Sequence, residues 1–198
     1  FMKKIFTLLL FISGINAAHA QFYGSHPIYT TAEINFGNYI GIDIDLNYLL
    51  EEKYTFKIGY TGNVRPAVSR PDDYTAGMKG ILFYGFGNPY DQLHNFHIGA
   101  GKILKINKRG TIRANLIVGL GFMTIREPVN WEKNDNTFLS ESYRWDYKKY
   151  NTLSLVFNPK IEFPFTRFYG LTLSPLLQIS KDRTFVGVGI GQMLGRLR

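Results

Sequence analysis

Residues 39–60 read YIGIDIDLNYLLEEKYTFKIGY, and this stretch decides the fold. From Ile40 to Tyr48 every second residue is apolar, and the residues between them are small or polar. After Glu51-Glu52-Lys53 the alternation resumes, with apolar positions at Tyr54, Phe56, Ile58 and Tyr60. A period of two places alternate side chains on opposite faces of a strand. The stretch therefore predicts two antiparallel strands, each with one apolar face and one polar, charged face.

The length of these strands suits a membrane. Ten residues of strand span about 33 Å at ~3.3 Å per residue, or about 25 Å along the membrane normal when the strand is tilted by about 40°. The apolar band of an outer-membrane barrel has this height. We therefore expect the apolar face to meet lipid and the charged face to line the interior of a closed barrel.

The first residues have the pattern of a Sec-type export signal. Met2-Lys3-Lys4 is positively charged, residues 5–12 are largely apolar, and Ala18-His19-Ala20 offers the small residues of a cleavage site. The apolar run is much shorter than the ~20 residues that a membrane-spanning helix needs. We expect cleavage near Ala20, with residues 1–20 as the signal peptide and residues 21–198 as one barrel domain in the bacterial outer membrane.

Composition agrees with an exported barrel. The absence of cysteine excludes a small secreted scaffold held by disulfides. Aromatic residues make up 16% of the chain and there are 20 glycines, yet the mean hydropathy is moderate, because lipid-facing and interior-facing residues alternate. The net charge is +8. On an exported chain, this charge favours outer-membrane lipid and lipopolysaccharide as partners over nucleic acid.

The alternation recurs along the chain. Counted from Tyr39, it predicts eight strands, at residues 39–49, 54–63, 74–86, 95–106, 111–124, 151–163, 171–180 and 185–194. Residues 29–38 have the same pattern and are either the start of one long strand or a separate strand. A separate strand would make nine, and the even strand number of these barrels would then require ten. The predicted class is all-β, an antiparallel up-and-down transmembrane β-barrel of about eight strands, with ten as the alternative.

Two segments break the pattern. Residues 126–149 mix charged and aromatic side chains and predict a long extracellular loop, whereas residues 64–73 are rich in Pro, Arg and Asp and predict a second loop. With both termini periplasmic, residues 126–149 fall outside and residues 107–110 fall inside. Residues 64–73 would then also fall inside, where connections are short, and this conflict stays open. Exposed aromatic residues mark recognition surfaces or interface belts, and the candidates are Trp131, Trp145 and Tyr147.

Charged residues on the predicted interior face form the candidate site. They are Asp43, Asp45, Lys57, Arg113, Lys160 and Glu162. A barrel this narrow cannot leave them unpaired, because a buried unpaired charge costs several kcal/mol. We therefore predict an ion-pair network that plugs the lumen, with a small-solute pore as the alternative. Inward-facing glycines at residues 187, 189 and 191 would let the barrel close.

The export signal, the alternating strands and the segment Phe185-Val186-Gly187-Val188-Gly189-Ile190-Gly191 resemble the small outer-membrane β-barrel families, OmpA/OmpX-like in the broad sense. The glycine-rich and tyrosine-rich style is similar to that of uncharacterised barrels of Bacteroidetes-type bacteria. The resemblance covers nearly the whole mature chain and implies a structural or surface-interaction role without catalysis. The ending Gly195-Arg196-Leu197-Arg198 departs from the aromatic last residue that is usual in proteobacterial members.

Barrels of this size also include lipid A deacylases and acyltransferases, so a lipid A-modifying enzyme is an alternative. The candidate bases are His26, His94 and His97, but neither His94 nor His97 lies in the His-x-Ser-Asn signature of the deacylases. Residues 132–135 lack the glycine pattern of a calcium loop, and we expect no metal and no cofactor. A soluble periplasmic lipocalin-like barrel, with its apolar face inward, is the last alternative.

Cations near the predicted rims could bind lipopolysaccharide phosphates or could be ordinary snorkelling side chains. They are Arg65, Arg70, Arg126, Lys148 and Lys149.

Overall fold

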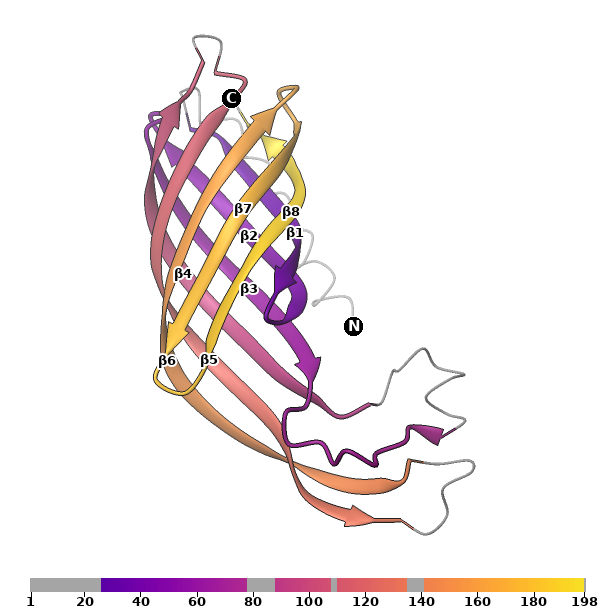
Figure 1. The fold of residues 1–198 in the computed structure, drawn as a ribbon. Coiled ribbons are helices and arrows are strands. Elements are labelled where there is room, and N and C mark those ends of the chain that lie inside the picture. Colours follow the sequence, from indigo (N-terminus) through magenta and orange to yellow (C-terminus); the bar gives the residue numbers. More distant parts are fainter. Residues whose placement is uncertain (1–25, 78–87, 108–109, 135–140, 198) are drawn as a thin grey trace, which may run out of the picture.

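The computed structural model describes residues 26–77, 88–107, 110–134 and 141–197. The predicted signal peptide lies outside these residues. The strands are β1 (Ile28–Gly37), β2 (Ile40–Leu50), β3 (Tyr54–Pro66), β4 (Tyr90–Lys105), β5 (Arg113–Lys133), β6 (Tyr143–Pro164), β7 (Tyr169–Ser180) and β8 (Thr184–Arg196). Each strand pairs antiparallel with the next, and β1 pairs with β8, which closes the barrel (Figure 1). Within the described part of the chain, no helix is long and apolar enough to cross a membrane.

The predicted class and the number of eight strands are confirmed, but the set of strands differs from the prediction. Residues 28–37 form a strand of their own, because the chain reverses at Asn38, whose amide group bonds to the backbone at the start of β8 at 2.8 and 3.0 Å. The predicted strand at residues 74–86 has no place in the ring. Residues 74–77 are not in a strand and residues 78–86 lie outside the described part, while β3 pairs directly with β4 from Tyr54↔Lys102 to Pro66↔Tyr90.

This correction removes the topological conflict. Residues 67–89 form one connection between β3 and β4, so the alternation of up and down strands places it at the same barrel end as the β5–β6 connection. The connections at the other end are short, at residues 51–53, 106–112 and 165–168. Figure 1 shows the described parts of the two long connections at one end of the barrel, opposite the end of β8.

The predicted loop at residues 126–149 is largely strand. Residues 127–133 of β5 and 143–149 of β6, here called the β5–β6 ribbon, pair with each other beyond the last partners of β4 and before the first partner of β7. The β5 side of the ribbon contains a bulge between Val129 and Glu132. The ribbon therefore extends beyond the barrel and bends to one side of it (Figure 1).

The apolar faces point outward, as predicted. Ile42, Ile44, Leu116 and Val118 are 47%, 49%, 47% and 53% exposed, whereas Asp43 and Asp45, which alternate with Ile42 and Ile44 along β2, are buried. A soluble lipocalin-like barrel has the opposite arrangement, so this alternative is wrong.

The interior has three layers. An apolar layer at the end with the long connections contains Tyr39, Leu93, Met123, Ile125, Val156, Leu176 and Phe185. A second apolar layer at the opposite end contains Tyr29, Leu49, Ile103, Met193 and Leu197. Most of the buried charged side chains belong to the strand segments between these two layers.

The pairing of β3 with β4 predicts that residues 67–89 are dispensable for the barrel. Pro66 and Tyr90 are already opposite each other, so a turn of about four residues can join them. We expect a variant with this replacement to keep the heat-modifiable migration of a folded barrel in detergent gels. Loss of that migration, with the wild-type chain refolded in parallel, would mean that this connection supplies part of the wall.

Candidate functional site

The candidate site is a set of charged side chains in the barrel interior. It consists of Glu33 on β1, Asp43 and Asp45 on β2, Lys57 on β3, His97 on β4 and Lys160 on β6, here called the interior network. All six residues are at most 4% exposed. Each of these six residues occupies an inward-facing position in the alternation of its strand, so closure of the barrel brings their side chains together.

Lys160 is the centre of the interior network. Its Nζ atom lies 3.0 Å from Glu33 Oε1, 2.7 Å from Asp45 Oδ2 and 3.8 Å from Asp43 Oδ2. Lys57 Nζ lies 3.0 Å from the same Asp45 oxygen and donates a hydrogen bond to Asn158 Oδ1 at 2.8 Å. Two lysines thus share one carboxylate, and one lysine contacts three.

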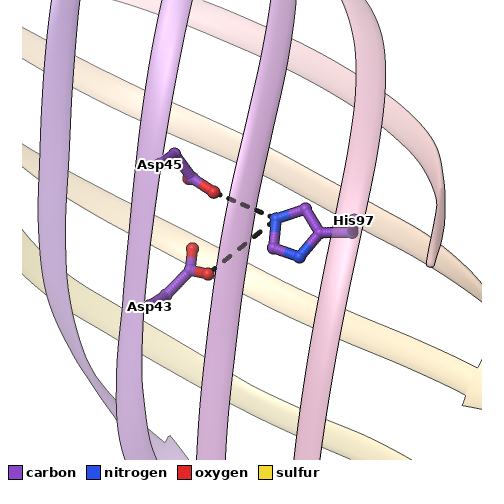
Figure 2. Close-up of side chains that lie close together, drawn as sticks. All are labelled: Asp43, Asp45 and His97. Atoms are coloured by element: carbon purple, nitrogen blue, oxygen red, sulfur yellow. Dashed lines mark hydrogen bonds and ion pairs between the residues drawn. The ribbon is translucent and has the colours of Figure 1, made fainter. Parts of the chain in front are cut away.

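His97 completes the interior network (Figure 2). Its Nε2 atom lies 3.0 Å from Asp45 Oδ1 and 4.0 Å from Asp43 Oδ1. Asp45 and His97 lie on β2 and β4 and are separated by Gly59 of β3, which is opposite both residues. A Cβ atom at Gly59 would lie 2.0 Å from Asp45 Oδ1 and 2.7 Å from His97 Nε2. Only glycine lets the two side chains meet across the middle strand.

The same arrangement occurs on the other side of the barrel. Gly191 of β8 lies opposite Thr172 of β7 and Glu33 of β1. Thr172 Oγ1 donates to Glu33 Oε1 at 2.7 Å, and Ser174 Oγ donates to Glu33 Oε2 at 2.5 Å. A Cβ atom at Gly191 would lie 2.6 Å from the Glu33 Cα atom. Inward glycines therefore give the polar side chains room to pair across a strand.

A second ion pair lies near the end of β8. Arg113 Nε lies 2.5 Å from Glu162 Oε2, and Tyr29 and Asn115 donate to Glu162 Oε1 at 2.8 and 2.9 Å. Arg113 Nη1 also donates to the Leu197 backbone carbonyl at 2.9 Å. This pair joins the wall to the segment after β8.

All six charged residues proposed from the sequence lie inside the barrel, but they form two groups: Arg113 and Glu162 pair apart from the other four. Sequence reasoning missed Glu33, and it treated His97 only as an isolated interior histidine. The signal for Glu33 was present in the alternation of residues 29–38, where Ala32, Ile34 and Phe36 mark the outward face.

The interior network is not suited to a metal ion. Asp43, Asp45 and His97 offer ligand atoms within 4.8 Å of one another. However, two lysine ammonium groups lie 3.0 and 2.7 Å from Asp45. They supply positive charge at the place where a cation would bind, and they would repel it. Asp43, Asp45 and His97 are therefore better explained by their contacts with one another and with the two lysines than as the ligands of a metal ion.

The three aromatic residues proposed for surface recognition belong to a folded outer module. This module consists of residues 67–77 and the β5–β6 ribbon. The Trp131 and Trp145 rings lie 5.6 Å apart, and the Tyr74 ring lies edge-on to each at 6.1 Å. Both tryptophans are half-buried. The Tyr147 ring lies 4.8 Å from the Arg126 guanidinium. The tryptophans therefore pack the β3–β4 connection onto the ribbon and keep part of their surface exposed.

Polar contacts hold the same two parts of the outer module together. The hydrogen bond from Tyr143, followed by that from Lys133, lowers the pKa of Asp73, and the two donors lie 2.7 and 3.1 Å from its carboxylate. Burial raises the pKa of Tyr74 to about 12. Thr75 and Ser142 exchange backbone and side-chain hydrogen bonds at 2.7 to 3.3 Å. The connection is thus attached to the ribbon by both ring packing and charge.

The charges of the interior network predict a compensating pair of substitutions. Three carboxylates face two lysines, and the His97 ring lies 3.0 Å from one of these carboxylates, that of Asp45. His97→Gln should lower the free energy of unfolding by about 2 kcal/mol, because it removes the hydrogen bond between the His97 ring and the buried Asp45 carboxylate. Asp43→Asn in the same chain removes the carboxylate with the longest ion-pair contacts, 3.8 Å to Lys160 and 4.0 Å to His97, and should recover about half of the loss. Urea unfolding in detergent micelles measures both effects. Strictly additive losses in the double variant would contradict the charge coupling.

Comparison with known proteins shows the fold. No protein-family model matches the chain, and no curated protein matches it. The crystal structure of Ail, the attachment invasion locus protein of Yersinia pestis, matches with a TM-score of 0.52 and 10% identity over 88% of this chain and 99% of that one. The N-terminal β-barrel domain of Pseudomonas aeruginosa OprF matches with a TM-score of 0.54 and 10% identity over 87% of this chain and 98% of that one. This chain has the fold of the small eight-stranded outer-membrane β-barrels.

Proposed function

We propose that this chain is a non-enzymatic outer-membrane protein with a closed lumen, which presents the outer module at the cell surface for interaction. The observation that supports this most is the distribution of side chains across the wall. Large apolar side chains are exposed all around the barrel, while its charges are paired inside. Such a surface is stable in lipid and costly in water.

The sequence supports the same location. Residues 1–20 have the pattern of a signal peptide cleaved near Ala20, and residues 21–198 would then form one barrel domain. Removal of Lys3 and Lys4 with the signal peptide leaves a net charge of 8 − 2 = +6, and outer-membrane lipid and lipopolysaccharide are the partners that such a wall and charge favour.

The interior supports a plug over a pore. The interior network lies between two apolar layers, and the fully buried side chains include Tyr39 and Phe185 in one layer and Tyr29 and Leu197 in the other. An ion that entered would displace paired charges that have little alternative solvation. A barrel of eight strands leaves an interior just wide enough for its own side chains.

The contacts of His94 and His97 do not support an enzyme. His97 is enclosed by the wall and bonds to Asp45. His94 lies near the outer rim, where its Nδ1 atom is 2.6 Å from the Tyr60 hydroxyl and its Nε2 atom is 3.4 Å from Gln92 Oε1. In the described part of the chain, neither ring bonds to a serine, as the base of a hydrolase triad would.

The outer module supports a surface role. β6 has 22 residues, which span about 70 Å at ~3.3 Å per residue. This is about twice the length that a tilted strand needs to cross the apolar band. The additional length carries Trp145 and Tyr147 and pairs with the part of β5 that carries Trp131, so the aromatic residues are held in a fixed arrangement outside the barrel. Fixed aromatic groups are suited to recognition because little entropy is lost when a partner binds.

The closed lumen predicts an absence of channel activity. Purified protein in planar lipid bilayers should give no stable unitary conductance. A variant that thins both apolar layers and the interior network, with Phe185→Ala, Met193→Ala and Lys160→Ala, should give open events if it still shows heat-modifiable migration. Steady single-channel steps from the wild-type chain would contradict the plug.

Display of the outer module can be tested by labelling, because the chain contains no cysteine. Arg144 lies in the β5–β6 ribbon, and Lys53 lies in the β2–β3 turn at the opposite end of the barrel. The Arg144→Cys variant should react with a membrane-impermeant maleimide on intact cells, whereas the Lys53→Cys variant should react only after the outer membrane is permeabilised. The reverse result would place the ribbon in the periplasm and overturn the proposed display.

A further inference from the structure

The outer wall of β4, β5 and β6 changes from apolar to cationic in three rungs below the outer module. In the first rung, Phe96, Phe122 and Leu153 lie side by side and are 64%, 51% and 76% exposed. The second rung, which is nearer to the outer module, contains His94, Thr124 and Asn151. The third contains Gln92, Arg126 and Lys149. The residues between them, including Leu93, Met123 and Ile125, are buried inside the barrel, so all three rungs face outward.

Arg126 and Lys149 are directly opposite each other on neighbouring strands. Like charges in this position destabilise a strand pair. Among the described residues, neither cation forms an ion pair with a carboxylate. The adjacent carboxylate of Glu127 has the opposite parity and pairs with Arg183. An anion between Arg126 and Lys149 would turn this repulsion into attraction.

The Arg126 side chain is already held in place. Its guanidinium lies 4.8 Å from the centre of the Tyr147 ring. Stacking on an aromatic face leaves the N–H groups at the edge of the guanidinium free to donate in the plane. In that orientation the group can donate two parallel hydrogen bonds to a phosphate.

The height of the cationic rung matches that of lipid phosphates. Lys149 lies four residues before Leu153 of the first rung along β6, which is about 13 Å at ~3.3 Å per residue. With a tilt of about 40° this is about 10 Å along the membrane normal. The interfacial region of a bilayer is ~5–8 Å thick on each side. A lipid whose acyl chains lie against the first rung therefore has its phosphate near the third.

We propose that Arg126 and Lys149, with the Gln92 amide beside them, bind the phosphate of an anionic lipid in the outer leaflet. Thr124 and Asn151 lie one rung below, where they face the glycerol or sugar part of the headgroup, and Phe122 and Leu153 contact the acyl chains. This site deepens the proposed function and rests on it, because it requires the barrel to be in a membrane. It also assigns a role to two of the rim cations, Arg126 and Lys149, and not to their neighbour Lys148.

The chain contains a matched control for this site. Arg144 and Lys148 are an exposed arginine and an exposed lysine, both in β6. In the alternation of that strand they lie on the face opposite to Lys149. The double variant Arg126→Gln/Lys149→Gln and the control Arg144→Gln/Lys148→Gln remove the same side chains and the same charge. Heat-modifiable migration verifies that each variant is folded.

Native mass spectrometry of the detergent-solubilised full-length protein then measures retained phosphatidylglycerol and phosphatidylcholine. Wild type and control should retain phosphatidylglycerol in preference to phosphatidylcholine. The Arg126→Gln/Lys149→Gln variant should lose about tenfold of its apparent affinity for phosphatidylglycerol. Equal loss in the control variant would mean that general charge attracts the lipid and would overturn the site.

Two further arms separate the remaining explanations. Inorganic phosphate added at millimolar concentration should not displace phosphatidylglycerol, because it lacks the acyl chains that contact the first rung. Complete displacement would show a free-phosphate site and would overturn the assignment to a lipid. A wild-type chain that fails to insert into phosphatidylcholine vesicles would refute the proposed function itself. A chain that inserts but shows no preference for phosphatidylglycerol would refute only the lipid site.

Discussion

The barrel depends on the compensation of charge around Lys160. An ammonium group in a space enclosed by protein loses its hydration, and only close carboxylates offset that loss. Glu33 and Asp45 supply such contacts at 3.0 and 2.7 Å. They come from two neighbouring strands, whereas Lys160 comes from the far side of the ring, so the contacts cross the lumen. The wall is therefore held at a fixed diameter by ion pairs as well as by the backbone ladder.

This compensation places a demand on residues that carry no charge. Asp45 and His97 meet only because Gly59 lies between them, and Thr172 reaches Glu33 only past Gly191. Elsewhere in a strand, glycine weakens the structure. In a narrow barrel, an inward glycine provides the space that two neighbouring polar side chains need. The glycine content of the chain is thus tied to its interior charge, and the two apolar layers exclude water from the pairs they enclose.

The sequence was sufficient to predict which face of each strand points inward, because alternation reports parity. It therefore identified Asp43 and Lys160 as interior residues. It did not predict which interior residues pair with each other, because the alternation of faces carries no information about the register between strands. The role of Gly59 appears only when β2, β3 and β4 are aligned. The strand predicted at residues 74–86 from a weak, glycine-rich apolar pattern has no place between β3 and β4 in the ring. The strand at residues 28–37 was left undecided and out of the count, which hid Glu33 and placed the loop after residue 63 at the wrong end of the barrel.

The alternation that builds the wall also explains why the outer module can be rigid. β5 and β6 leave the barrel as a pair whose base is fixed by the two neighbouring strands, β4 and β7, so the β5–β6 ribbon begins with its register and twist already set. A two-stranded ribbon alone is marginally stable in water. Here Trp131 and Trp145 pack against Tyr74, and Asp73 bonds to Tyr143, so the β3–β4 connection supplies a third packing element. The charge-filled barrel below thus serves as a rigid base, and the chemistry available to partners is concentrated in the part of the chain that it supports.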